Sequence, residues 1–191
     1  METKTMAFTG PRPAKLCGWK HAAYKNLIDR LVIKLKGYYK DGIRKFISGG
    51  AQGFDQCAFA AVDKMINRFG YTDVQNVVYV PFQGQQERWV DEGCFGQREY
   101  QEMLDLATEV KILAPHPTDS KEYSKLLFDR NIAMVKDADI IFALYDKNDW
   151  RDSFGGTQYT MRKACEYRKE LHQAKFVIRD NQVKLTRICI V

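Results

Sequence analysis

The chain has 191 residues and a formal net charge of +6, with a sequence pI near 9.0. Its 45% hydrophobic and 28% charged residues are typical of globular proteins, which excludes the disordered and fibrous classes. The length suits one well-buried domain spanning residues 1–191 better than two. The positive charge favours an anionic partner such as a nucleotide or nucleic acid, although charge governs association and not fold.

In chain order, apolar runs of strand length alternate with patterns of helical period. We predict a strand over 5–9, a helix over 21–39, a strand over 45–47, a helix over 56–69, a strand over 77–80, a helix over 99–107, a strand over 110–113, a helix over 123–136, a strand over 140–144, a helix over 157–171, and terminal strands over 176–178 and 188–191. Gly70 stands where a helix C-cap belongs. Continuously apolar strands and the β-α-β order predict an α/β fold with a mainly parallel sheet covered by helices on both faces.

Targeting and metal signals are lacking in this sequence. The first residues show no basic segment followed by an apolar stretch, and no apolar run approaches the roughly 18 residues of a membrane span. The cysteines form no CxxC pair and the three histidines are scattered, so we expect no metal site, no cofactor and no membrane partner. A reduced, cytoplasmic compartment follows, with most cysteines buried. The five cysteines are Cys17, Cys57, Cys94, Cys165 and Cys189.

The strongest motif is the glycine turn over residues 48–55, between a predicted strand and a predicted helix. Gly49, Gly50 and Gly53 let the backbone approach a ligand without a Cβ atom in the way. The helix start adds unpaired N–H groups and the positive end of the helix dipole, so the turn predicts an anion site. Ser48 replaces the first glycine of the dinucleotide fingerprint and no acidic residue ends the next strand, which argues against ordinary NAD binding. A tight turn without a ligand is the alternative.

A second glycine turn, Asp152-Ser153-Phe154-Gly155-Gly156-Thr157, follows the strand predicted over 140–144 and leads into the helix predicted over 157–171. Thr157 is either the cap of that helix or a phosphate ligand. Because the carboxyl ends of parallel strands meet at one edge of a sheet, we expect both turns to face one crevice. Asp55, at the end of the first turn, is either the N-cap of its helix, which the sequence favours, or a polar group facing the ligand.

Three further residues have a binding and a structural interpretation each. Arg12, in the turn after the first strand, supplies a charge-assisted bond to an anion or belongs to a rigid surface turn. Arg130 reaches a phosphate or lies in solvent. Trp89, in a polar loop, stacks on a base or anchors that loop.

These motifs together resemble the SLOG superfamily, which joins DprA/Smf DNA-processing proteins and LOG phosphoribohydrolases, and within it the YpsA-like branch of bacteria and their phages. The matching residues are the turn over 48–55; Thr9, Gly10, Pro11, Arg12 and Pro13; Pro81, Phe82, Gln85 and Trp89; Arg130, Asn131, Met134, Asp137 and Asp139; and Gly155, Gly156, Thr157, Thr160 and Arg162. The resemblance implies a Rossmann-like three-layer sandwich that binds nucleotides or their derivatives in that crevice. The ligand-binding residues it implies are Thr9, Gly10, Arg12, Ser48, Gly49, Gly50, Gly53, Asp55, Pro81, Trp89, Arg130, Asn131, Gly155, Gly156, Thr157 and Thr160.

The family leaves three functions open for this chain. The first is a module that senses, carries or sequesters a nucleotide-like ligand, as in anti-phage defence. The second is a LOG-like N-glycosidase, with Asp55 and Arg130 as catalytic candidates; Thr160 stands where LOG enzymes carry a catalytic Glu, and Asp55 or Glu87 would have to replace that carboxylate. The third is DprA-like binding of single-stranded DNA, which the charge supports although no basic run is interleaved with aromatic residues. The sequence allows a homodimer without locating an interface.

Overall fold

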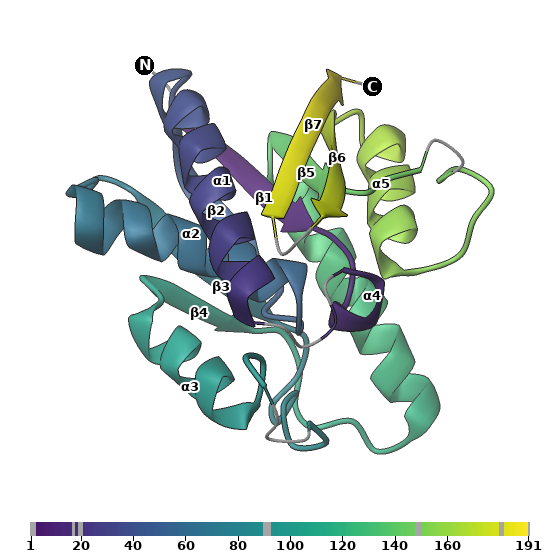
Figure 1. Cartoon of the computed structure of the whole chain (residues 1–191). Helices are drawn as coiled ribbons and strands as arrows, with labels where there is room; N and C mark the ends of the chain where they lie inside the picture. The colour runs from purple at the N-terminus through teal and green to yellow at the C-terminus, as the bar shows by residue number, and fades with distance from the viewer. Residues whose placement is uncertain are drawn as a thin grey trace.

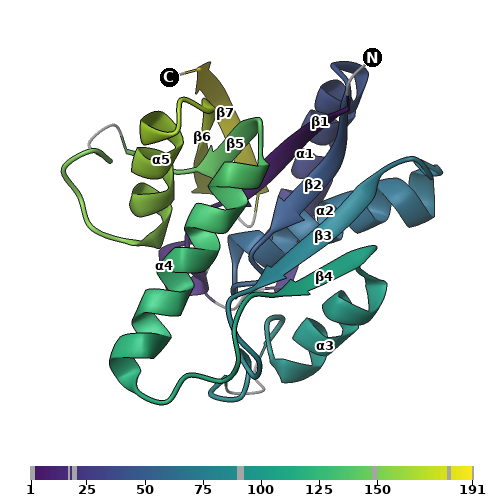
Figure 2. The ribbon, with the colours of Figure 1, turned by 180° about the vertical axis from the view of Figure 1, so that it is seen from behind.

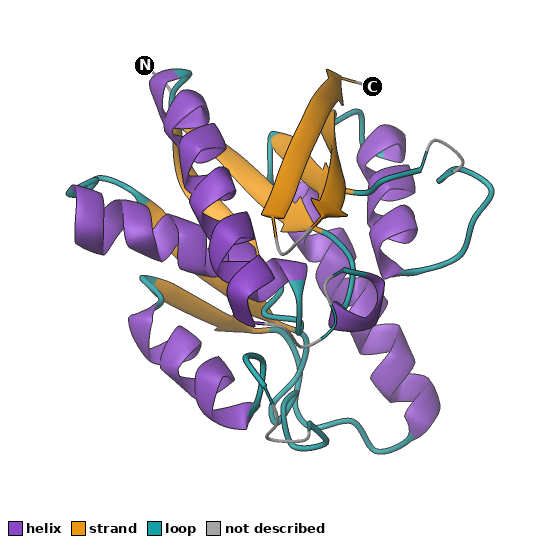
Figure 3. Cartoon of the chain, in the orientation of Figure 1, coloured by secondary structure: helices purple, strands orange, loops and turns teal. Residues whose placement is uncertain are grey.

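The structure, a computed structural model, describes residues 3–16, 18, 21–89, 93–147, 150–179 and 182–190. Within this part of the chain, seven strands form one sheet in the order β4-β3-β2-β1-β5-β6-β7, parallel except for the β6–β7 pair (Figures 1 and 3). The strands are β1 (Lys4–Thr9), β2 (Ile43–Ser48), β3 (Gln75–Val80), β4 (Glu109–Ile112), β5 (Ile140–Leu144), β6 (Glu170–Arg179) and β7 (Gln182–Ile190). The helices are η1 (Pro13–Lys15), α1 (His21–Lys40), α2 (Phe54–Phe69), α3 (Gln97–Leu106), α4 (Ser120–Asp137) and α5 (Gly156–Glu166).

Helices cover both faces of the sheet, and alternate strand residues supply the two cores. Met6 and Phe8 of β1 pack with α1 and α2, whereas Ala7 between them packs with α4 and α5. α3 lies on the side of α2 and closes a third cluster over β3. Figure 2 shows α4 and α5 on the face opposite to α1 and α2. The predicted Rossmann-like, three-layer α/β fold is therefore confirmed.

The largest error in the predicted elements lies between α5 and β6. The helix predicted over 157–171 ends at Glu166, and β6 begins at Glu170, well before the strand predicted over 176–178. Arg168 makes the turn with a φ of 54°, so no glycine announces it. His172 and Gln173 are buried in β6, and because they are polar the sequence does not show the apolar pattern of a buried strand there. Hydrogen bonds between His172 and Tyr38, and from Gln173 to backbone carbonyls, offset the cost of burying these polar groups. β7 is likewise longer than the strand predicted over 188–191.

Burial departs from expectation at the sheet edge and at one cysteine. β4 is an edge strand, so Val110 and Ile112 are exposed although the strands were predicted to be buried. Cys57 is buried and Cys94 is half-buried, but Cys165 is exposed, so the expected burial is wrong there. Cys17 and Val191 lie outside the described residues. Among the described helices, none is long and apolar enough to cross a membrane.

Helix ends follow local chemistry where the sequence signals it. Gly70 ends α2 in the left-handed conformation, with its N–H donating to Ile66 O and Met65 O, as predicted. α4 begins earlier than predicted because Asp119 caps it. The Asp119 carboxylate accepts from the N–H groups of Lys121 at 2.8 Å and Glu122 at 2.7 Å. This cap matters for the site because α4 carries Arg130 and Asn131.

We expect Asp119→Ala to lower the free energy of unfolding by about 0.5–2 kcal/mol, because the two capped N–H groups lose their partner. Urea denaturation at neutral pH measures this change. Asp119→Asn, which keeps an accepting oxygen, is the matched control and should lose only a fraction of that value. Equal losses in both variants would contradict the capping role.

Candidate functional site

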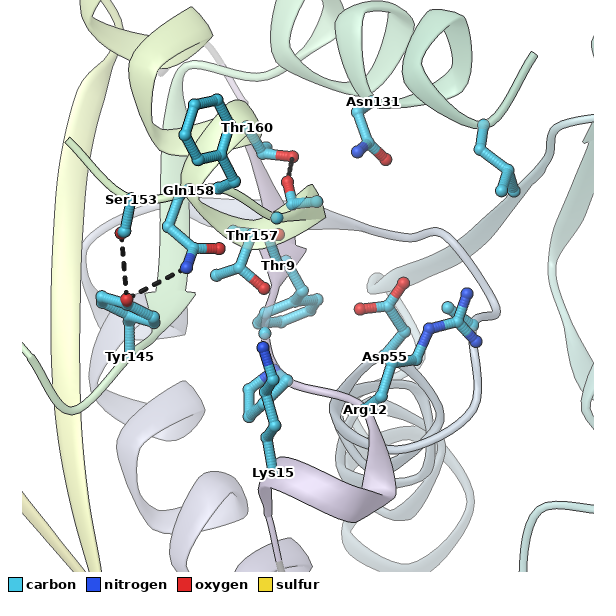
Figure 4. A pocket seen from close by; sticks show the side chains of 18 of the residues that line it. Thr9, Arg12, Lys15, Asp55, Asn131, Tyr145, Ser153, Thr157, Gln158 and Thr160 are labelled. Carbon is cyan, nitrogen blue, oxygen red and sulfur yellow. Dashed lines mark hydrogen bonds between the residues drawn. The ribbon is translucent and has the colours of Figure 1, made fainter. Parts of the chain in front are cut away.

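A cavity of about 800 Å³ lies between β1 and β5, the point of the sheet at which the strand order reverses. β1 pairs in parallel with β2 on one side and with β5 on the other. The cavity lies at the carboxyl ends of β1 and β5, between Thr9 and Tyr145, and both side chains appear on its wall in Figure 4. Open α/β sheets bind ligands at such a switch point, and the volume falls in the range of small-molecule sites.

The loop after β1 brings two cations to this cavity. Arg12 precedes η1 and Lys15 is its last residue, and both are exposed and line the cavity. Figure 4 shows Lys15 pointing toward Thr157 and Arg12 lying beside Asp55. The loop is fastened to α2, because Phe54 N–H donates to Pro11 O at 3.1 Å and a Cβ at Gly10 would lie 2.3 Å from Phe54 Cδ1. The two cations therefore stand on an anchored loop.

The glycine turn after β2 is packed against other parts of the protein. A Cβ at Gly49 would lie 1.6 Å from Arg130 Nη1, and one at Gly50, where φ is +65°, would lie 2.9 Å from Tyr100 Cε2. Gly53 is the N-cap of α2, with a φ of +97° and Pro11 O close by. Each glycine thus makes room for a neighbouring group of the protein itself.

Asp55 is the second residue of α2 and not its N-cap, so the capping role favoured by the sequence is wrong. Its carboxylate lies in the cavity wall, 8% exposed, with Oδ2 3.8 Å from Arg130 Nη1. Burial raises the pKa of Asp55, while the charges of Arg130 and Arg12 and backbone hydrogen bonds from Ala51 and Gly49 act in the opposite direction. The backbone N–H groups of this turn therefore donate to a carboxylate of the protein itself, that of Asp55.

Arg130 projects from α4 into the interior and not into solvent. It is 5% exposed, donates from Nη1 to the carbonyl of Gly49 and donates from Nε to Asn131 Oδ1 at 2.9 Å. Burial lowers the pKa of Arg130, with the charge of Asp55 opposing that shift. Arg130 ties α4 to the turn after β2, and it also forms part of the cavity wall.

The start of α5 opens into the cavity from the β5 side. Its N-cap is Gly155, with a φ of 149° and no side-chain cap hydrogen bond. Gly156 and Thr157 line the cavity, so the first turn of α5 presents the positive end of a helix dipole there. A Cβ at Gly156 would find its nearest atom, Asn131 Nδ2, at 3.9 Å, which leaves open space. Thr160, 2% exposed, donates to Gly156 O at 2.9 Å.

The structure brings most of the sequence-predicted site residues to one place. Those lining the cavity are Thr9, Gly10, Arg12, Asp55, Arg130, Asn131, Gly155, Gly156, Thr157 and Thr160. Those that do not line it are Ser48, Gly49, Gly50, Gly53, Pro81 and Trp89. The two glycine turns do flank one crevice, but the turn after β2 reaches it through Ala51 and Asp55.

Two side chains for which the sequence suggested a functional role, Trp89 and Glu87, lie outside the cavity lining. Trp89 packs edge to face on Tyr100, with ring centroids 4.9 Å apart, and its carbonyl accepts from Gln97, so it anchors its loop on α3. Glu87 contacts His116 at 3.2 Å, outside the cavity lining. Among the described residues, no group of three His, Cys, Asp or Glu side chains could hold a metal ion.

Several cavity residues carry no sequence signal of their own. The lining also contains Lys15, Lys147, Tyr145, Gln158 and Phe154, which are not among the predicted ligand-binding residues. No residue pattern marks Lys15, because its place at the switch point follows from the strand order of the whole sheet. Phe154, 91% exposed beside the second glycine turn, lines the cavity, whereas Trp89 does not.

Comparison with known proteins gives a consistent family and fold. The YpsA family model, described as the YspA SLOG family, matches residues 6–182. UPF0398 proteins of Bacillus cereus strain B4264 and Bacillus thuringiensis strain Al Hakam are each 29% identical over 147 residues, which is 75% of this chain and 75% of the relative.

A solved structure with a similar fold is DNA processing protein A from Helicobacter pylori, described for its single-stranded DNA binding mode. The TM-score is 0.52 at 14% identity, with 94% of this chain and 67% of that chain covered. At this identity the likeness concerns the fold alone.

Proposed function

Because this chain belongs to the YpsA SLOG family, we propose that its cavity at the β1/β5 switch point binds an anionic, nucleotide-derived small molecule. The ligand is sensed, carried or sequestered there and leaves unchanged. The observation that carries this proposal is the uncapped start of α5, Gly155 to Thr157, opening into the same cavity as Arg12 and Lys15. Backbone N–H groups at a helix start are a general means of binding phosphate.

The charges around the cavity support an anionic ligand. Arg12, Lys15 and Lys147 are exposed cations in its lining, and Asp146 is the exposed carboxylate among the described lining residues. Asp55 is offset by Arg130 and therefore adds little net charge. The ligand's phosphate is expected at Thr157 and Lys15, which point toward one another in Figure 4. The turn after β2 is less suited to bind the phosphate, since backbone N–H groups of this turn already donate hydrogen bonds to the Asp55 carboxylate.

Hydrolysis has less support than binding. Thr160 stands where LOG enzymes carry a catalytic Glu, and its hydroxyl is used within α5. Asp55, the buried carboxylate of the lining, is held by Arg130 and by backbone hydrogen bonds. A carboxylate positioned at a glycosidic bond is what an oxocarbenium-like transition state needs. We therefore expect AMP to be recovered intact after incubation with the protein.

Single-stranded DNA is the competing ligand class. The similar fold of the Helicobacter pylori protein and the exposed rim cations favour it. Binding through phosphates alone falls steeply with salt. A mobility shift with a single-stranded oligonucleotide at two salt concentrations distinguishes this class from a small ligand.

We expect AMP at about 100 times its Kd to raise the melting temperature of the protein by roughly 5–10 °C, because a ligand that binds the folded state alone adds about 2.7 kcal/mol. In Arg12→Gln and in Lys15→Gln, loss of a charge-assisted contact should weaken AMP binding roughly tenfold. Differential scanning fluorimetry and calorimetric titration measure the two effects.

The matched control is Lys34→Gln, which removes an exposed lysine of α1 outside the cavity and should bind as the parent protein does. If AMP, ADP, NAD and ADP-ribose all leave the melting temperature unchanged, the proposed function is wrong. Release of free base from AMP would instead establish the glycosidase alternative.

A further inference from the structure

The segment that leads into α5 is held at several points although it is a loop. Trp150 is 2% exposed and belongs to the core under α4 and α5. Arg162 Nη1 donates to the carbonyls of Trp150 at 3.2 Å, Arg151 at 3.3 Å and Ser153 at 2.8 Å. Because one guanidinium donates to three backbone carbonyls, it restrains the backbone of residues 150–153.

The next contact fixes Ser153 from the cavity side. Its Oγ lies 3.3 Å from the hydroxyl of Tyr145, which also accepts from Gln158 Nε2 at 3.0 Å (Figure 4). A Cβ at Gly155 would lie 2.5 Å from Gln158 Oε1, and the φ of 149° at Gly155 is one that favours glycine. The residues on both sides of position 154 are therefore restrained, and the residue between them has little freedom of backbone.

Phe154 occupies that restrained position with its side chain in water. It is 91% exposed, the most exposed large apolar side chain among the described residues, and it lines the cavity next to the N-cap of α5. A single exposed apolar residue is ordinary on a protein surface. A large aromatic side chain on a fixed backbone, one residue from an anion-binding helix start, is a preorganised contact for the rest of an anionic ligand.

We infer that Phe154 is the specificity-determining residue of this cavity, stacking on the flat aromatic base of a ligand whose phosphate lies at the start of α5. This inference rests on the proposed function and adds to it the residue that would recognise the base of a nucleotide-derived ligand, so that a sugar phosphate without a base should bind less well. Stacking on an aromatic side chain tolerates every base, because each has a π face. Phe154 therefore selects for the presence of a base and leaves its identity to other contacts.

Two probes that differ by the base test the inference, AMP and ribose 5-phosphate. The parent protein should bind AMP more tightly than ribose 5-phosphate, and Phe154→Ala should weaken AMP binding roughly 5- to 150-fold while leaving ribose 5-phosphate binding unchanged. Phe154→Trp should keep the preference for AMP, and AMP but not ribose 5-phosphate should quench the added tryptophan emission. Calorimetric titration and fluorescence measure these effects.

The matched control is Phe69→Ala, which removes another exposed phenylalanine, 45% exposed, outside the cavity lining. It should bind both probes as the parent protein does. If the parent protein binds both probes but Phe154→Ala leaves their affinity ratio unchanged, or weakens both equally, stacking is overturned and the proposed function stands. If the parent protein binds neither probe, the proposed function fails for nucleoside monophosphates and the stacking inference fails with it.

Discussion

Replacing Arg130 by methionine is expected to lower the free energy of unfolding by about 3–5 kcal/mol at pH 7, because Asp55 then stays buried without its counter-charge. Both residues are under a tenth exposed, so water replaces little of the lost interaction with the guanidinium. The same change also removes the hydrogen bond to Gly49 O that joins α4 to the turn after β2. Urea denaturation followed by circular dichroism measures the loss.

The pH dependence of that loss identifies its cause. Burial raises the pKa of Asp55 and Arg130 opposes the shift, so Arg130→Met should raise this pKa further. A carboxyl whose pKa is higher in the folded than in the unfolded state favours folding below its unfolded pKa of about 3.9, and this contribution is lost as pH rises through the folded pKa. The deficit of Arg130→Met should therefore shrink toward pH 4 and grow toward pH 7.

Two further variants make this result specific. In Arg130→Met with Asp55→Asn, no buried charge remains, so part of the stability should return and the pH dependence of the deficit should disappear. Lys125→Met removes a cation of the same helix from an exposed pair with Asp129 and should change stability by less than about 1 kcal/mol. A double variant no more stable than Arg130→Met, or an Arg130→Met loss no larger than that of Lys125→Met, would refute a buried ion pair as the source.

The order of elements could be predicted because the central strands β1, β3 and β5 are short, mostly apolar runs separated by patterns of helical period. Ile140–Leu144 is buried on both faces and was predicted with its observed bounds. The boundary at Arg168 could not be predicted, because a left-handed turn without glycine leaves no mark in composition. Polar residues of β6 such as His172 add to the difficulty, since their hydrogen-bond partners come from segments distant in sequence.

The sequence groups residues that the structure brings to one cavity with residues of a turn that packs against the protein itself. Three glycines in a turn between a strand and a helix indicate that another group lies close to the backbone there. The sequence does not show whether that group belongs to a ligand or to another part of the protein. At Gly49 it is the side chain of Arg130, 81 residues along the chain. Conversely, Arg12 and Lys15 line the cavity because β1 lies at the switch point, and the strand order that defines this point is a property of the whole sheet.

The two glycine turns can be separated by valine substitutions. Gly156→Val is expected to weaken AMP binding on the order of 100-fold, because the side chain fills the space where the phosphate would meet the first N–H groups of α5, and two charge-assisted hydrogen bonds are worth about that factor. The nearest atom to a Cβ there is 3.9 Å away and φ is not positive, so the melting temperature of the ligand-free protein should change little. Calorimetric titration with AMP and a thermal melt without it measure both effects.

Gly50→Val should show the opposite pattern. Its φ of +65° and a Cβ 2.9 Å from Tyr100 Cε2 and 3.0 Å from Met103 Cε predict a loss of stability of roughly 1–3 kcal/mol or more. The fraction that stays folded should still bind AMP, because Gly50 does not line the cavity. Gly37→Val, on the exposed face of α1 with no neighbouring atom within 4 Å of a Cβ, controls for the side chain itself. If Gly50→Val abolishes AMP binding in a protein that remains folded while Gly156→Val binds normally, the phosphate lies at the turn after β2, and Asp55 must leave the amides of that turn when the ligand binds.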